Sequence, residues 1–122
     1  CKYQDNLLRP ITYIRTYIDP AYNSLLSTPP FPEFPSGHSV QSGASALVLE
    51  SLFGNNYAFQ DKTHNNRVDI NGAPRNFESF SEFANEAAIS RLYGGIHFSR
   101  AIYEGVTFGR NVGKNVAEFK MD

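Results

Sequence analysis

Arg91 is a charged residue at a position where a packed helix would place an apolar one. It follows a run of apolar residues at helical spacing between Phe80 and Ala87, so we expect it on the apolar face of a helix. A buried guanidinium is costly unless it is paired. Two interpretations of Arg91 are equally open: an ion pair with Glu86 or Asp69, or part of a binding site for an anion.

His97 lies six residues after Arg91, and the pair Gly94-Gly95 separates them. Because glycines let the chain turn sharply, the two side chains can face one ligand despite the unfavourable helical spacing. We expect His97 at the start of the next helix, where free N–H groups and the helix dipole favour anions. A lone histidine is more often structural than catalytic, but this position favours a function.

The segment Pro35-Ser36-Gly37-His38-Ser39 is the second candidate for chemistry. A Ser-Gly pair just before a helix offers a hydroxyl and backbone N–H groups to an oxyanion. His38 stands at the junction of loop and helix, from which it could transfer protons to the same ligand. The alternative is an ordinary N-cap turn with an exposed histidine.

Two further cations, Lys2 and Arg9, are seven residues apart and share a face if that stretch is helical. Spacing alone favours a solvated basic edge for them. His64 lies in a polar stretch, and we expect it to be exposed and without function. The single cysteine, Cys1, excludes an intrachain disulfide framework, and a catalytic thiol at this position is disfavoured.

Four helices can position these residues. The pattern predicts helices at about 3–18, with a kink or fresh start at Pro10, and at about 39–53, ending at Gly54. A third helix opens with the capping box of residues 79–82 and stops at Gly94, and a fourth runs from near residue 97 to about 119. One side of the fourth helix carries Ile102, Gly105, Gly109, Val112 and Val116. Residues 55–78 read as a long polar loop with a short hairpin, and the fold class is all-α.

Composition limits the function classes. The 122 residues suffice for one small domain with an ordinary apolar content of 41%, and the net charge of −1 gives no sign of a nucleic-acid partner or a polybasic membrane contact. No apolar run approaches the length of a transmembrane helix, and no targeting motif is visible. Since the chain does not begin with Met, we expect it to be part of a longer protein.

Three segments, taken in order, match a known signature. Residues 2–10 fit lysine, six residues, then arginine-proline; residues 35–38 read Pro-Ser-Gly-His; and residues 90–97 fit serine-arginine, five residues, then histidine. Together they resemble the superfamily of type 2 phosphatidic acid phosphatases, bacterial non-specific acid phosphatases and vanadium haloperoxidases. The resemblance implies a helical bundle of about four helices, with residues 1–122 as the C-terminal catalytic-core portion of a larger helical domain. It also suggests a periplasmic or secreted location.

The resemblance implies specific roles. The cradle for phosphate or vanadate would consist of three cations, a hydroxyl and a backbone amide, from Lys2, Arg9, Arg91, Ser36 and Gly37. His97 would be the nucleophile that forms a phosphohistidine, or the metal ligand if vanadate is bound, and His38 would be the general acid-base. Many relatives carry an aspartate four residues after the final histidine, where this sequence has Ala101. Either another group orients His97, or its ring is held less firmly.

The run from Thr28 to His38 resembles the haloperoxidase branch, in which the position of Phe31 lies near the proposed halide site. We therefore expect a vanadium-dependent haloperoxidase-like enzyme that uses vanadate, hydrogen peroxide and a halide. In such an enzyme, His38 would take a proton from hydrogen peroxide, and Lys2 would polarise the bound peroxide. A soluble acid phosphatase without a cofactor, acting on a phosphate ester, is the alternative, and a non-catalytic phosphate-binding fragment is the third. We also expect exposed apolar surface to favour self-association or contact with upstream helices.

Overall fold

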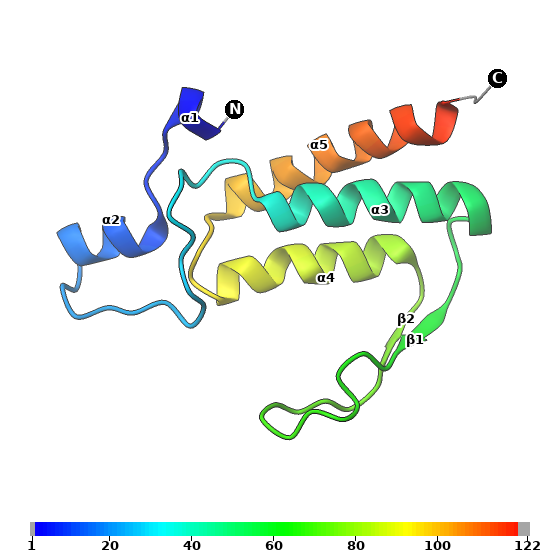
Figure 1. Cartoon of the computed structure of the whole chain (residues 1–122), viewed down its shortest axis with the longest axis horizontal. Coiled ribbons are helices and arrows are strands. Elements are labelled where there is room, and N and C mark those ends of the chain that lie inside the picture. Colours follow the sequence, from blue (N-terminus) through cyan, green and yellow to red (C-terminus); the bar gives the residue numbers. More distant parts are fainter. Residues whose placement is uncertain (1, 120–122) are drawn as a thin grey trace.

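Three long helices form the body of the molecule: α3 (Gly37–Phe53), α4 (Phe80–Tyr93) and α5 (Ser99–Glu118). They belong to a computed structural model, which describes residues 2–119. The three helices pack side by side, and α4 runs in the opposite direction to α3 and α5 (Figure 1). The predicted all-α class is confirmed, apart from one small sheet. The start of α3, the end of α4 and the start of α5 consequently lie at the same end of the bundle.

Local capping explains where α3 and α4 begin and end. The Ser36 side chain caps α3 by accepting a hydrogen bond from the Ser39 N–H, and Gly54 ends this helix with φ 92°. Ser79 accepts from the Glu82 N–H at the start of α4, as the capping-box pattern predicts. The prediction for α3 was two residues too short, because Ser36 caps the helix and its first turn includes residues 37 and 38.

Helices α3 and α5 approach so closely that side chains are excluded between them. A Cβ atom at Gly109 would lie 2.0 Å from the Val40 carbonyl oxygen, and one at Gly43 would lie 2.5 Å from that of Val106. The backbones of the two helices therefore meet at these glycines. The expected apolar side of α5 is partly wrong. Its buried residues are Ala101, Ile102, Gly105, Gly109 and Gly113, whereas Val112 and Val116 are 51% and 57% exposed.

The N-terminal segment is not one helix. It forms the short α1 (Lys2–Asp5) and then α2 (Pro10–Tyr17), with Asn6 at φ 45° in the break between them. Pro10 starts the second helix, as expected of a residue that lacks an N–H. The stretch from Lys2 to Arg9 is therefore not one helix, and the condition under which these two residues would share a helical face is not met. Both short helices lie beside one end of the bundle (Figure 1).

The long loop between α3 and α4 carries the predicted hairpin. Strands β1 (Phe59–Asp61) and β2 (Arg75–Phe77) pair antiparallel, with Phe59 opposite Phe77. The rest of the loop extends away from the helices (Figure 1). His64 is exposed within it, as expected.

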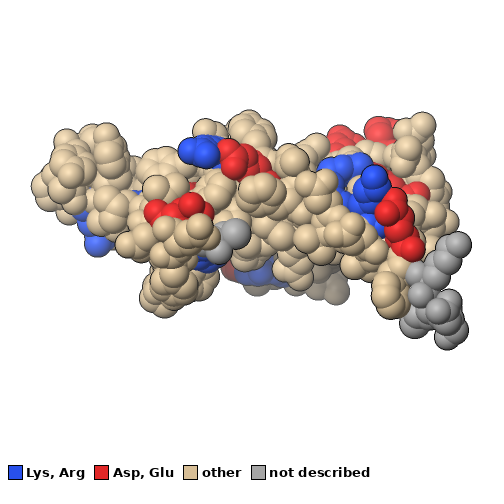
Figure 2. All heavy atoms as spheres, turned by 90° about the horizontal axis from the view of Figure 1, so that it is seen from above, with Lys and Arg blue, Asp and Glu red and all other residues tan. Residues whose placement is uncertain are grey.

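The face drawn in Figure 2 carries no large field of one sign. On the face drawn in Figure 2, basic and acidic side chains lie next to one another in small groups. None of the described helices combines the length and apolar character needed to cross a bilayer. Cys1, for which no role is expected, lies outside the described residues.

Candidate functional site

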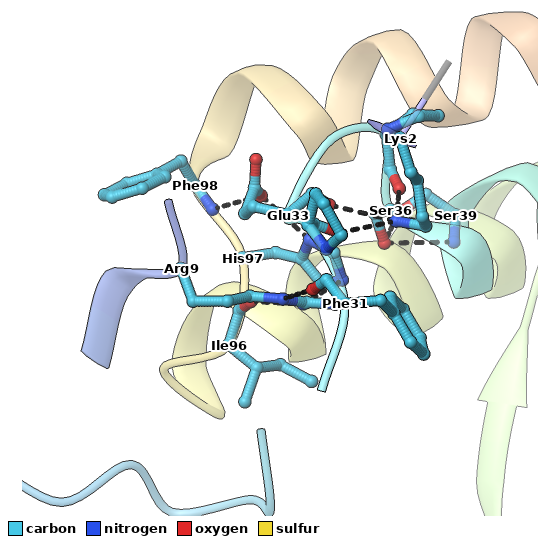
Figure 3. Close-up of polar contacts among 11 residues, drawn as sticks. Lys2, Arg9, Phe31, Glu33, Ser36, Ser39, Ile96, His97 and Phe98 are labelled. Carbon is cyan, nitrogen blue, oxygen red and sulfur yellow. Dashed lines mark hydrogen bonds and ion pairs between the residues drawn. The ribbon is translucent and has the colours of Figure 1, made fainter. Parts of the chain in front are cut away.

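His97 is buried, with 4% of its surface exposed, between an acidic and a basic side chain. Its Nδ1 lies 2.8 Å from a carboxylate oxygen of Glu33, and its Nε2 lies 3.2 Å from Nη1 of Arg9 (Figure 3). An ionised carboxylate only accepts hydrogen bonds and a guanidinium only donates them. Both neighbours therefore favour the same ring form, with the proton on Nδ1 and the lone pair on Nε2.

His97 lies close to the expected start of the last helix, but just outside it. Helix α5 begins at Ser99 with Phe98 as its N-cap, so the histidine precedes the helix by two residues. Gly94-Gly95 makes the expected turn, because Gly95 adopts φ 72°, a region that favours glycine. The free N–H of Phe98 is directed at Glu33 rather than at an open anion site, with a hydrogen bond of 3.0 Å.

Glu33 is the functional candidate that sequence reasoning missed. It is 1% exposed, and one carboxylate oxygen receives hydrogen bonds from both the His97 ring and the Phe98 amide. A signal was present: Glu33 is the one charged residue of the proline-rich run between Thr28 and Pro35. A buried carboxylate needs partners of this kind.

Arg9 is buried, with 6% of its surface exposed, and one of its terminal nitrogens has no partner among the described residues. Its Nε donates to the Phe31 carbonyl and its Nη1 to the Ile96 carbonyl, each at 2.9 Å. Its Nη2 is buried and has no hydrogen-bond partner within residues 2–119. Burial lowers the pKa of Arg9 from its usual value, while the charge of Glu33 opposes that shift. The guanidinium thus keeps a buried donor available for an acceptor such as an oxyanion oxygen.

Lys2 holds the proline-rich loop. Its ammonium donates to the carbonyl oxygens of Pro32 at 3.2 Å, Glu33 at 3.1 Å and Pro35. An ammonium has three protons, so these contacts occupy all of them. Burial, and next the charge of Arg9, lower the pKa of Lys2, and Glu33 opposes the shift. In this state Lys2 supports the loop rather than presenting a free donor.

Phe31 lies against both N-terminal cations. Its ring centroid is 5.2 Å from the Lys2 ammonium nitrogen and 5.1 Å from the central guanidinium carbon of Arg9. These distances suit cation–π contacts. The ring is 41% exposed and borders a shallow groove between residues 6–12 and 28–32, so a solute entering the groove would meet Phe31 and Arg9.

Ser36 and Gly37 form the turn into α3. Ser36 is fully buried; its N–H donates to the Ala101 carbonyl at 3.1 Å, and its Oγ accepts from the Ser39 hydroxyl at 2.8 Å. Gly37 is exposed, and a Cβ atom there would meet nothing within 4 Å. The turn is therefore anchored on one side by α5 and open on the other, above the Gly37 backbone.

His38 and Arg91 border this site from α3 and α4. His38 is exposed, yet desolvation and the charges of Arg91 and then His97 lower its pKa. Arg91 is half-buried, and its Nε donates to the Ser90 hydroxyl at 3.1 Å. The ion pair considered for it is wrong, since among residues 2–119 both suggested acidic partners pair with other arginines.

The donor set suits an anion better than a bare metal ion. Within residues 2–119 no group of three or more His, Cys, Asp or Glu could hold a metal ion. An oxyanion needs no such cluster, because cations and N–H groups bind its oxygens and one imidazole suffices as a ligand. The arrangement can bind a multiply charged oxyanion beside an imidazole lone pair.

Comparisons with known proteins match the fold of this chain to one family. The family model of the VCPO second helical-bundle domain matches residues 16–122. A structure described as the first bacterial vanadium-dependent iodoperoxidase superposes with a TM-score of 0.84 at 50% identity, covering 94% of this chain and 27% of that one. The apo and holo forms of a bacterial vanadium-dependent chloroperoxidase give TM-scores of 0.77 and 0.74, each at 20% identity, covering 96% and 90% of this chain and 31% and 29% of theirs. The search of curated proteins gave no match.

Proposed function

Because this chain belongs to the family of the VCPO second helical-bundle domain, we propose that it carries the oxyanion site of a vanadium-dependent haloperoxidase. The chain spans only 27% of the iodoperoxidase that it matches, so the activity is proposed for the full-length protein. The observation that carries the proposal is a buried donor without a partner beside a ring nitrogen. Nε2 of His97 contacts Nη1 of Arg9 at 3.2 Å, and an oxyanion ligand would replace that contact.

The residues present fit vanadate on three counts. Arg9 keeps a buried donor without a partner, a Cβ atom at Gly37 would meet nothing within 4 Å, and Nε2 of His97 lies beside the same guanidinium. A charge-assisted hydrogen bond to an oxyanion would satisfy the buried Arg9 donor, which is costly to leave unpaired. Bound vanadate would supply the activation of hydrogen peroxide toward halide.

The chain's own residues would divide the remaining work. Nε2 of His97 would ligate the oxyanion, while Arg9 and Arg91 would bind its oxygens and compensate their charge. Ser36 and the Gly37 N–H would complete the cradle. His38, whose lowered pKa favours the neutral form, would accept the proton of peroxide as general base.

Lys2 has a less direct role in this proposal than the family signature suggests. Its three donors hold carbonyl oxygens of the loop, so it must give up one of them to reach an oxyanion. Its positive charge still lies close to the site without direct contact. The ammonium lies over the same Phe31 ring that Arg9 contacts.

Iodide is the halide we propose first, because the relative with 50% identity is described as an iodoperoxidase. Phe31 would lie at the halide position, where its exposed ring borders the groove beside Arg9. An aromatic wall favours a large, weakly hydrated anion over a small one.

The test is a direct assay of the full-length protein. Vanadate-loaded protein should oxidise iodide with hydrogen peroxide, and His97→Ala should lose this activity. The surface variant His64→Ala serves as a control, since His64 is exposed in the hairpin loop. Absence of halide oxidation with vanadate bound would refute the proposal.

The same assay separates the alternatives. Phosphate-ester hydrolysis without vanadate, lost in His97→Ala, would indicate the acid phosphatase with a phosphohistidine intermediate. Binding of phosphate with no turnover of either kind would indicate a non-catalytic phosphate-binding domain. Sizing experiments on residues 1–122 alone test the expected self-association.

A further inference from the structure

We propose that Glu33 is the positioning residue of the site, which fixes the His97 ring with its proton on Nδ1 and its Nε2 lone pair toward the oxyanion. The inference rests on the proposed role of His97 as the oxyanion ligand. Glu33 lies outside the three-part signature. The inference names the group that orients the His97 ring, in a sequence that has Ala101 at the usual aspartate position.

The first support is the contact itself. Glu33 and His97 are 1% and 4% exposed, and the 2.8 Å distance from carboxylate oxygen to Nδ1 is a hydrogen bond shielded from water. Arg9 donates from the opposite side of the ring, toward Nε2. Only the Nδ1–H form satisfies both contacts, so the ring is oriented before any ligand arrives.

The second support is that Glu33 is itself held on several sides. Its side chain accepts the Phe98 N–H at 3.0 Å (Figure 3). Its backbone N–H donates to the Leu7 carbonyl at 3.0 Å, and its carbonyl accepts from Lys2 at 3.1 Å. A carboxylate that positions another group must not move. These contacts tie Glu33 to the N-terminal segment and to the start of α5 at once.

The third support is the surroundings of Ala101. This residue is fully buried, and its carbonyl accepts the Ser36 N–H at 3.1 Å, which joins α5 to the turn before α3. Its side chain has no polar atom and cannot orient the His97 ring. Among the described residues, the carboxylate that contacts Nδ1 of His97 is that of Glu33, from the proline-rich loop.

The experiment reads the ring tautomer of His97 in the ligand-free, full-length protein by nitrogen-15 NMR. The His97 signals are assigned by their loss in His97→Asn. In the wild type we expect a protonated Nδ1 and an unprotonated Nε2. A wild-type Nε2 that carries the proton would overturn the proposal without the need for any variant.

Three substitutions then test the cause. Glu33→Leu removes the acceptor and should convert His97 to a mixture of tautomers, whereas Glu33→Gln keeps an acceptor oxygen and should retain the wild-type pattern. Glu118→Leu is the matched control, because Glu118 is exposed near the end of α5. A wild-type pattern in folded Glu33→Leu would overturn the proposal.

A binding measurement gives a second readout. Titration with inorganic vanadate should show roughly 10–100-fold weaker binding for Glu33→Leu, the usual effect of losing a group that supports a ligating histidine, with Glu33→Gln in between. Equal affinities would overturn the role in ligand binding. Because the tautomer is read without ligand, a protein that lacks halide oxidation but shows the Nδ1–H form refutes the proposed function alone.

Discussion

Replacing Arg9 with leucine should destabilise the full-length protein by an amount that follows from its contacts. The substitution removes two charge-assisted hydrogen bonds to the carbonyls of Phe31 and Ile96 and a third to Nε2 of His97, each worth roughly 1.5–3 kcal/mol. It also removes the buried, unpartnered Nη2, whose desolvation costs about 1–3 kcal/mol. The net loss in free energy of unfolding is therefore roughly 1.5–8 kcal/mol.

Urea denaturation followed by circular dichroism measures this difference. The matched control is Arg15→Leu, because Arg15 also makes two hydrogen bonds, to Tyr22 and Asn23, but is exposed. We expect the control to lose less than about 1 kcal/mol, the usual range for exposed pairs. A loss of the same small size in natively folded Arg9→Leu would refute the reasoning.

The free Arg9 donor adds a second expectation for the same variants. Inorganic phosphate at 100 times its dissociation constant should stabilise the wild type by about 2.7 kcal/mol. At that same concentration Arg9→Leu should gain much less, since a bound oxyanion would no longer find the buried donor. Equal stabilisation of both proteins would show that Arg9 does not contact the anion.

The remaining predictions concern protons and packing. Because the pKa of His38 is lowered, its basic form persists to more acidic pH, so halide oxidation should decline only below about pH 6.5, the ordinary histidine value. In His38→Ala, a pH profile should show this acidic limb absent and the rate reduced by roughly 10²–10⁴. Gly109→Ala should cost about 1–3 kcal/mol or more in urea denaturation, because the new methyl group meets a carbonyl of α3, whereas Gly37→Ala should leave stability unchanged. Arg110→Leu leaves the buried Glu50 without its cationic partner and should cost roughly 2–3 kcal/mol by the same measurement. This is less than for a fully buried pair, because Arg110 is partly exposed and Ser81 still donates to Glu50.

The helices were predictable because their signals are local. Ser79, Gly54 and Pro10 each act within one turn, and each marks a helix boundary in the structure as expected. The start of α5 was misplaced, because Phe98 caps it without a side-chain hydrogen bond and so leaves no sequence signal. The exposure of Val112 and Val116 on α5 was also not foreseen. The buried side of α5 follows its glycines, which let its backbone approach that of α3, and hydrophobicity does not indicate such contacts.

The site was predictable only in part. The signature named Arg9 and His97, which lie in contact, but the contact spans 88 residues and no local pattern encodes it. Lys2 was placed in the cradle by resemblance, whereas the structure commits its donors to the loop. Glu33 was missed because a single acidic residue in a proline-rich run carries no periodicity, and its importance arises only from burial beside the ring.

The attachment of the N-terminal segment has a consequence for the order of folding. Helices α1 and α2 make no helix-to-helix contacts with the described bundle. Loop residues join them to it, notably through the hydrogen bond from Arg9 to the Ile96 carbonyl and the backbone hydrogen bond from Glu33 to Leu7. The bundle can therefore form first, and the N-terminal segment then completes the site. The free energy of local opening at the site should be smaller than that of global unfolding. In native-state hydrogen exchange, the Glu33 amide should exchange faster than the amides in the middle of α3.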